Sequence, residues 1–206
     1  MENSQPQSRI IQSNDRVFVC GKTGSGKTVL AKYLTAKLSR LIVLDPKGSL
    51  DNWDCLEPNE RNIKKFLNGE PLRLRFVPPL TDAADYWQLP VELAFNAGDC
   101  VIYVDELYGV VPPGQRAGEM FSALWTRGRE FGIGAWGASQ RPSWVPLVCI
   151  SEADHHFVFR LTLDEDRARM AAFMGDAVMQ PITDRHGFWQ MSQVDDVPVY
   201  NPGLKI

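Results

Sequence analysis

The stretch from Gly21 to Thr28 reads GKTGSGKT and has the residue types of a phosphate-binding loop. Its spacing fits G-x-x-x-x-G-K-[ST], in which glycines let the backbone curl so that its N–H groups point at phosphate oxygens. The helix after such a loop adds its positive N-terminal end. We therefore predict that Lys27 reaches the β and γ phosphates of a nucleotide and that the Thr28 hydroxyl binds Mg²⁺. The predicted nucleotide-binding residues are Gly21, Lys22, Thr23, Gly24, Ser25, Gly26, Lys27 and Thr28.

An acidic pair, Asp105 and Glu106, follows the apolar run VIYV. A carboxylate at the tip of a buried strand beside the phosphate loop is suited to hold Mg²⁺ through water, and Asp105 takes this position. Glu106 is placed to polarise the attacking water as a general base. Read alone, the pair also fits a solvated strand end. Beside a phosphate loop it favours hydrolysis, because kinases of small molecules usually lack the adjacent glutamate and switch GTPases carry an N-K-x-D motif that this sequence lacks.

A third polar group follows the apolar strand predicted at 133–138, which ends in Ser139-Gln140. The uncharged amide of Gln140 would lie beside the phosphates, where it can hydrogen-bond the γ phosphate or the water. The alternative is a polar loop residue after a strand.

The elements that position these groups alternate between buried strands and helices. Continuous apolar strands alternating with helices predict an α/β fold around a mostly parallel sheet, with strands at the C-terminal end on its edge. In the first helix we expect Leu30, Tyr33, Leu34 and Leu38 on one face; in the last we expect Asp164 as the N-cap. We predict a flexible lead-in at 1–14 and a single domain at 15–206. Strands are expected at 17–20, 41–45, 72–77, 100–105, 133–139 and 155–161, and helices at 28–39, 60–67, 115–132 and 164–175.

Four blocks of the sequence resemble the FtsK–HerA class of ASCE P-loop ATPases. They are GKTGSGKT, LIVLDPKG, VIYVDE and RGREFGIGAWGASQRP, in the order and rough spacing of that class, although Ser139 stands where threonine is common. The resemblance runs from about residue 15 to 175. It implies a RecA-like fold, ATP and Mg²⁺ as cofactors, and a homo-oligomeric ring, a hexamer or pentamer, that moves double-stranded DNA through its pore.

The resemblance also assigns roles. It makes Lys27, Glu106 and Gln140 catalytic, gives Mg²⁺ to Thr28 and Asp105, and suggests Arg129 as an arginine finger that reaches into the neighbouring subunit's site. Arg127 is the alternative finger. The two arginines are two positions apart, about 200° around a helix, so they cannot both point at one phosphate; the motif alignment favours Arg129.

Within this class the chain is most similar to the small genome-packaging ATPases of viruses in the double-jelly-roll lineage. That resemblance implies action in the cytoplasm of an infected cell, no membrane insertion, and a capsid or portal vertex as a further partner. The alternatives are a motor for conjugation or DNA processing, and an ATPase that powers protein assembly or secretion, as in filamentous-phage export.

Net charge restricts how DNA would be held. The formal net charge is −3, whereas a non-specific nucleic-acid binder usually carries a basic face. We therefore expect few phosphate contacts per subunit, multiplied around a ring. The candidate DNA contacts are Tyr108 and Arg116 in LYGVVPPGQR, and Arg141 and Trp144 in RPSWVP. Each segment also fits a simple connection between a strand and a helix.

Overall fold

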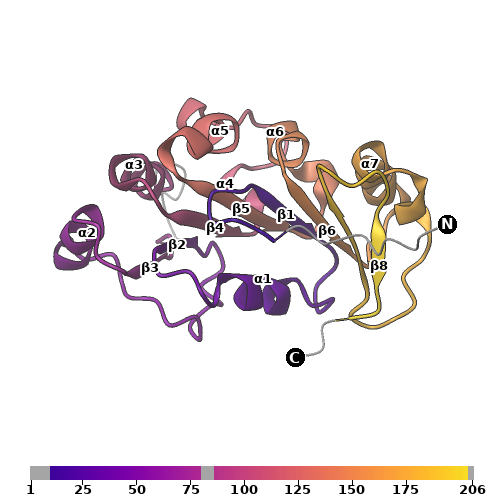
Figure 1. Ribbon diagram of the computed structural model, residues 1–206, viewed down its shortest axis with the longest axis horizontal. Coiled ribbons are helices and arrows are strands. Elements are labelled where there is room, and N and C mark those ends of the chain that lie inside the picture. Colours follow the sequence, from indigo (N-terminus) through magenta and orange to yellow (C-terminus); the bar gives the residue numbers. More distant parts are fainter. Residues whose placement is uncertain (1–9, 80–85, 204–206) are drawn as a thin grey trace.

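The computed structural model describes residues 10–79 and 86–203, which are built around one eight-stranded sheet (Figure 1). The strand order is β3-β2-β4-β5-β1-β6-β7-β8. The strands from β3 to β6 in that order run parallel, and β7 and β8 are antiparallel additions at one side. The predicted mostly parallel α/β fold with C-terminal edge strands is confirmed. The strands are β1 (Val17–Cys20), β2 (Leu41–Leu44), β3 (Arg73–Phe76), β4 (Val101–Asp105), β5 (Gly134–Ser139), β6 (His155–Phe159), β7 (Phe188–Ser192) and β8 (Val199–Asn201).

Helices cover the two faces of the sheet unequally. In Figure 1, α3, α5, α6 and α7 lie on one face and α1 lies on the other. The helices are α1 (Lys27–Thr35), α2 (Glu60–Leu67), α3 (Gln88–Ala97), α4 (Leu107–Val110), α5 (Glu119–Arg127), α6 (Leu147–Ser151) and α7 (Asp164–Met174). Short 3₁₀ turns are η1 (Gly128–Phe131), η2 (Pro142–Trp144) and η3 (Asp176–Met179). Within the described residues, no helix has both the length and the apolar character needed to cross a membrane.

Two hydrophobic clusters, one on each face, hold the layers together. The side chains of Phe18 and Ile42 pack with Leu124 of α5, whereas Val17 and Val43 pack with Leu30 of α1. All residues of β1 and β2 are buried, which explains why these strands read as unbroken apolar runs. Each fully buried Val, Leu, Ile or Phe contributes roughly 1.5–3 kcal/mol, so the central strands are the most firmly anchored part of the chain.

Several predicted helix details are wrong. The first helix ends at Thr35, not near residue 39, because Ala36 N–H donates to the Tyr33 carbonyl and begins tighter turns. Of the predicted apolar face, Leu30 is buried and Leu34 and Leu38 are partly buried against the core, but Tyr33 is 60% exposed and faces solvent. Asp164 is the first residue of α7; the N-cap is Leu163, and the Asp164 carboxylate pairs with Arg167.

The predicted lead-in lies partly outside the described residues, since residues 1–9 are not among them. Residues 10–14 run beside the start of β5, and the Ser13 carbonyl lies where a side chain at position 134 would project, so only glycine fits at Gly134.

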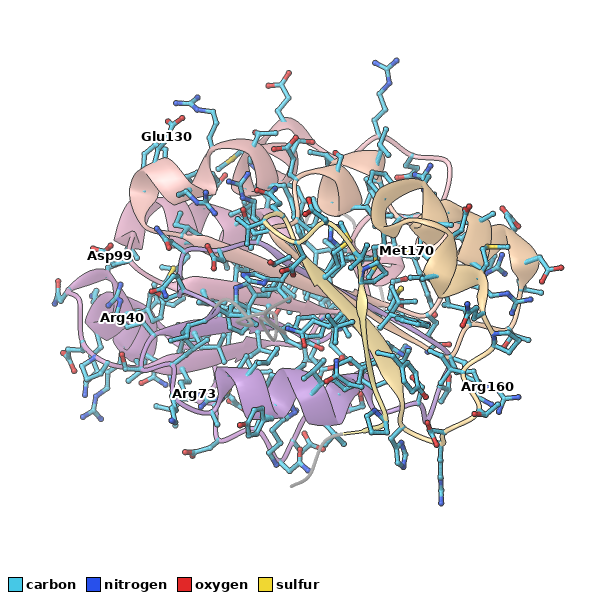
Figure 2. All side chains as sticks on the ribbon, turned by 45° about the vertical axis from the view of Figure 1, so that its right-hand side comes forward. Arg40, Arg73, Asp99, Glu130, Arg160 and Met170 are labelled. Carbon is cyan, nitrogen blue, oxygen red and sulfur yellow. The ribbon has the colours of Figure 1, made fainter. Side chains whose placement is uncertain are left out.

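The two ends of the parallel strands lie on opposite sides of the molecule. Figure 2 shows Arg40, Asp99 and Glu130, which precede β2, β4 and β5, toward the left, and Arg160, which follows β6, at the right. Ligands of open α/β sheets bind at the carboxyl ends of the strands. The side marked by Arg160 is therefore where a site is expected.

Candidate nucleotide site

The GKTGSGKT loop, residues 21–28, leaves the carboxyl end of β1 between β5 and β6. Each neighbouring strand holds it by one backbone hydrogen bond: Gly21 N–H donates to the Ser139 carbonyl at 3.1 Å, and Lys22 N–H donates to the Arg160 carbonyl at 2.9 Å. The start of the loop is thereby fixed to the middle of the sheet.

Glycine is required in this loop by conformation and by space. Gly21, Gly24 and Gly26 have φ of 151°, 75° and 113°, in the region that favours glycine. A Cβ at Gly21 would lie 2.5 Å from Cβ of Phe159, and one at Gly26 would lie 3.1 Å from the Phe159 ring. The Phe159 side chain of β6 therefore forms a wall against which only a bare backbone fits.

The loop carries cationic and hydroxyl groups of the kinds that bind phosphate. Lys27 Nζ folds back onto its own loop, donating to the Gly21 carbonyl at 2.6 Å and the Lys22 carbonyl at 3.2 Å. Burial lowers the pKa of Lys27, whereas the nearby Glu106 carboxylate raises it. Ser25 Oγ is buried with no hydrogen-bond partner among the described atoms, and Thr28 is exposed at the start of α1. An incoming phosphate would supply an acceptor for the Ser25 hydroxyl.

Asp105 ends β4 beside this loop. Burial raises the pKa of Asp105 to about 6, although the hydrogen bond from Tyr103 Oη to its Oδ1, at 2.9 Å, lowers it. The neighbouring carboxylates of Asp45 and Glu106 raise it further. A desolvated carboxylate with acidic neighbours favours a nearby cation. Carboxylate and hydroxyl oxygens are ligands that Mg²⁺ takes, so the chemistry of Asp105 and Thr28 fits this ion.

Glu106 is only 3% exposed, and both of its carboxylate oxygens are engaged. Oε1 accepts from Ser139 Oγ at 2.9 Å and from the Gln140 backbone N–H at 3.0 Å. Oε2 is paired with Lys47 Nζ at 3.2 Å. Its φ of 121° is a strained value for a residue with a side chain, and such strain concentrates at functional sites.

The structure therefore brings the predicted Gln140 and Glu106 together, through the backbone of the former. It also adds residues to which the sequence assigned no role. Lys47, in the turn after β2, and Ser139, at the end of β5, bond to the Glu106 carboxylate. His186 Nδ1 lies 3.2 Å from the Ser25 carbonyl. Lys47 lies in the LIVLDPKG block and Ser139 in the SQRP block, so only the motif blocks gave a signal for them, whereas nothing marked His186.

A cleft of about 470 Å³ adjoins the loop on its β6 side. It begins at Lys22 and is walled by the chain after β6 and by the segment after η3. Its lining residues are Lys22, Val158, Phe159, Arg160, Leu161, Thr162, Arg167, Val178, Gln180, Pro181, Ile182 and Thr183.

Arg129 lies at the other end of the strands, away from this site. Its Nη2 donates to Asp154 Oδ2 at 2.6 Å and to Asp15 Oδ1 at 3.1 Å, and these carboxylates precede β6 and β1. The Arg129 side chain is 40% exposed. Arg127 is more open, 63% exposed, and pairs only with the exposed Glu130 among the described residues. Neither arginine takes part in its own subunit's nucleotide site.

Three of the four candidate DNA contacts form one cluster. The Tyr108 and Trp144 rings meet edge to face at 5.8 Å, and the Arg141 guanidinium lies 4.5 Å from the Trp144 ring centroid. Arg141 also pairs with the buried carboxylate of Asp166 at 2.6 Å. Arg116 is exposed in the loop after α4, outside this cluster.

A phosphate loop after β1, with an Asp-Glu pair at the end of β4 and with β5 between these two strands, is the arrangement of a P-loop NTPase. Comparison with known proteins narrows this class. The chain is 34% identical over 171 residues to the DNA packaging ATPase P9 of Enterobacteria phage PRD1, covering 81% of this chain and 73% of P9. It belongs to the family of that packaging ATPase. No protein-family model matches the chain.

Solved structures share the fold. The genome packaging NTPase B204 of Sulfolobus turreted icosahedral virus 2, in complex with ATP-gammaS, has a TM-score of 0.75 and 16% identity, over 94% of this chain and 100% of B204. The conjugation coupling protein TcpA of pCW3 has a TM-score of 0.58 and 15% identity, over 90% of this chain and 60% of TcpA. At these identities the likeness concerns the fold alone.

Proposed function

We propose that this protein is a ring-forming motor that hydrolyses ATP to drive double-stranded DNA into a viral capsid in the cytoplasm of an infected cell. The observation that carries the proposal is the 34% identity to the packaging ATPase P9 over 73% of its length. A site equipped for hydrolysis supports it, since Asp105 and Glu106 stand beside a complete phosphate loop.

The phosphate loop would hold the triphosphate, with the Lys27 ammonium turned from its own carbonyls toward the β and γ phosphates. Thr28 and Asp105 would hold Mg²⁺, which neutralises charge on the phosphates when bound. The cleft beyond Lys22 adjoins the loop and has the volume of a site for a small ligand, so we assign the base and ribose to it.

Hydrolysis requires a base within reach of water at the γ phosphate. In the step we propose, the water oxygen bonds to the γ phosphorus, its proton passes to Glu106, and the bond from that phosphorus to the ADP oxygen breaks. Ser139 and the Gln140 N–H fix Oε1 of Glu106. Oε2 is therefore the oxygen that would accept the proton.

A ring, a pentamer or hexamer, would place the amino end of one subunit's strands against the next subunit's site. Arg129 or Arg127 would then supply positive charge to the neighbour's phosphates. Arg127 would have to leave only the exposed Glu130, whereas Arg129 would have to leave two buried carboxylates. We retain Arg129 as the proposed finger on the motif alignment, and a mixing experiment described below separates the two.

The test is the steady-state ATPase rate, measured with and without linear double-stranded DNA under conditions where the ring assembles. A motor that moves on DNA should hydrolyse faster when DNA is present. A rate indifferent to DNA, together with no binding to DNA at low salt, would contradict the proposed function.

A further inference from the structure

Lys47 is the only lysine among the described residues whose ammonium pairs with the catalytic carboxylate, and the proposed chemistry gives it no role. Its Nζ lies 3.2 Å from Oε2 of Glu106, the oxygen that must accept the proton from water. Glu106 is buried, whereas the Lys47 side chain is 42% exposed. One end of this ion pair is therefore inside the site and the other is open to the surface.

The turn that carries Lys47 is fixed by a buried carboxylate. Asp45, fully buried at the end of β2, accepts hydrogen bonds from Ser49 N–H at 3.1 Å and Leu50 N–H at 2.9 Å. These bonds hold the backbone of the two residues Ser49 and Leu50, which follow Lys47 in the turn. The contact with Glu106 therefore depends on the flexible lysine side chain, which can leave without unfolding the turn.

Lys47 also adjoins the cluster of candidate DNA contacts. Its Nζ lies 5.9 Å from the Tyr108 ring centroid, within the range of a cation–π contact, and Tyr108 meets Trp144. The turn packs closely on α4, because a Cβ at Gly109 would lie 2.7 Å from the Pro46 ring. Lys47 and Trp144 are exposed, whereas Tyr108 and Arg141 are half-buried and Arg141 is paired with Asp166. This surface thus offers the Lys47 ammonium and two rings beside the catalytic base.

We propose that Lys47 is a DNA-responsive positioning residue that holds Oε2 of Glu106 until a phosphate of double-stranded DNA, bound on this surface, draws its ammonium away. Without DNA, the Lys47 ammonium is hydrogen-bonded to Oε2 of Glu106, so this oxygen is less able to accept the proton from water and hydrolysis is slow. With DNA, the ammonium pairs with the backbone phosphate, and Oε2 is open to the water proton. This inference rests on the proposed function, because it takes DNA as the partner.

The experiment compares Lys47→Ala with wild type, measuring kcat and KM for ATP with and without linear double-stranded DNA. We expect the DNA-free kcat of the variant to rise about fivefold, since a half-exposed ion pair of this kind holds up to about 1 kcal/mol. The KM for ATP should change little, and stimulation by DNA should fall toward none. Lys47→Arg, which keeps the cation, should restore a low DNA-free rate and stimulation.

Lys65→Ala is the matched control. Lys65 on α2 is similarly exposed, 37%, and pairs with the exposed Glu70 at 3.5 Å, so its replacement removes the same charge from a surface ion pair away from the site. It should leave both rates and DNA stimulation unchanged. A melting curve for each variant confirms that it is folded before rates are compared.

The outcomes separate the two proposals. If wild type is stimulated by DNA and Lys47→Ala shows the wild-type DNA-free rate and the wild-type stimulation, the role of Lys47 is overturned and the DNA motor stands. A DNA-free kcat that falls in Lys47→Ala overturns it as well, because Lys47 would then assist the base. If wild type neither binds DNA nor responds to it, both proposals fail.

Discussion

Replacing Arg129 with alanine should lower the free energy of unfolding, because this side chain neutralises two buried carboxylates. Its Nη2 lies 2.6 Å from Asp154 Oδ2 and 3.1 Å from Asp15 Oδ1, and these acid side chains are 1% and 2% exposed. A finger that acted only on a neighbouring subunit would have no such effect on an isolated chain. The measurement therefore tests whether Arg129 also has a structural role.

The expected loss in the free energy of unfolding depends on which partners Asp15 and Asp154 keep once Arg129 is removed. Breaking a fully buried pair by removing one partner costs about 3–5 kcal/mol. Here the Arg129 side chain is 40% exposed, which reduces the effect by screening. Asp154 also keeps hydrogen bonds from Arg16 N–H at 2.8 Å, and Asp15 keeps His155 Nε2 at 3.1 Å. We therefore expect a loss of about 2 kcal/mol, or about 4–8 °C in Tm for a domain of this size.

Arg127→Ala is the matched control, since Arg127 and its partner Glu130 are each 63% exposed and 3.5 Å apart. Exposed pairs contribute about 0–1 kcal/mol, so this variant should melt within about 2–4 °C of wild type. Urea unfolding without nucleotide, monitored by circular dichroism and by tryptophan fluorescence, gives the free energy of unfolding of each variant if the two probes agree. Equal stability of the two variants would refute the assignment of Arg129 to the buried carboxylates.

The remaining predictions concern the nucleotide site. Glu106→Gln should still bind ATP but lose roughly 10²–10⁴ in kcat, measured by phosphate release and nucleotide binding; wild-type turnover would remove Glu106 as the base. Asp105→Asn, compared without Mg²⁺, should be more stable than wild type by about 1–3 kcal/mol at pH 7. The folded pKa of Asp105 is raised to about 6, so the folded state binds more protons, and wild type should lose stability as pH rises from about 4 to 6. If the Tm values of wild type and Asp105→Asn changed with pH by the same amount between about pH 4 and 6, this prediction would be contradicted. Arg129→Ala subunits should regain ATPase activity when mixed with Lys27→Ala subunits; rescue with Arg127→Ala instead would make Arg127 the finger.

Much of the fold was predictable because the strands are buried on both faces. Runs such as VFVC and LIVL have no polar position, and both correspond to strands, β1 and β2, with every residue buried. The ends and the buried faces of the helices were harder to predict from the sequence. Tyr33 fits the apolar periodicity of α1 but faces solvent, since periodicity places an aromatic ring on a face without showing how far that face is covered. The short α6 was not predicted, because five residues hold too little periodicity.

In the candidate site, too, local features were predictable from the sequence and long-range contacts were not. The phosphate loop, Asp105 and Glu106 were predictable because each group is contiguous in sequence with the strand that positions it. The pairing of Lys47 with Glu106 joins residues 59 positions apart, and no local pattern encodes it. The same holds for Arg129, whose partners Asp15 and Asp154 lie 114 and 25 positions away. From the sequence, Arg129 could be placed only near the end of a helix. Its contacts with Asp15 and Asp154 are visible only in the folded structure.

The position of Glu106 explains how one carboxylate can respond to several parts of the molecule. It stands between β4 and α4, so a displacement of α4 moves its backbone directly. Its Oε1 is bonded to the end of β5, whose Ser139 carbonyl also holds the first residue of the phosphate loop. Its Oε2 is bonded to the turn after β2. The phosphate loop is therefore linked to this carboxylate through Ser139, and the turn after β2 is linked to it through Lys47. Under the proposed function, an exchange of partners at Glu106 would couple nucleotide to DNA without any motion of the sheet.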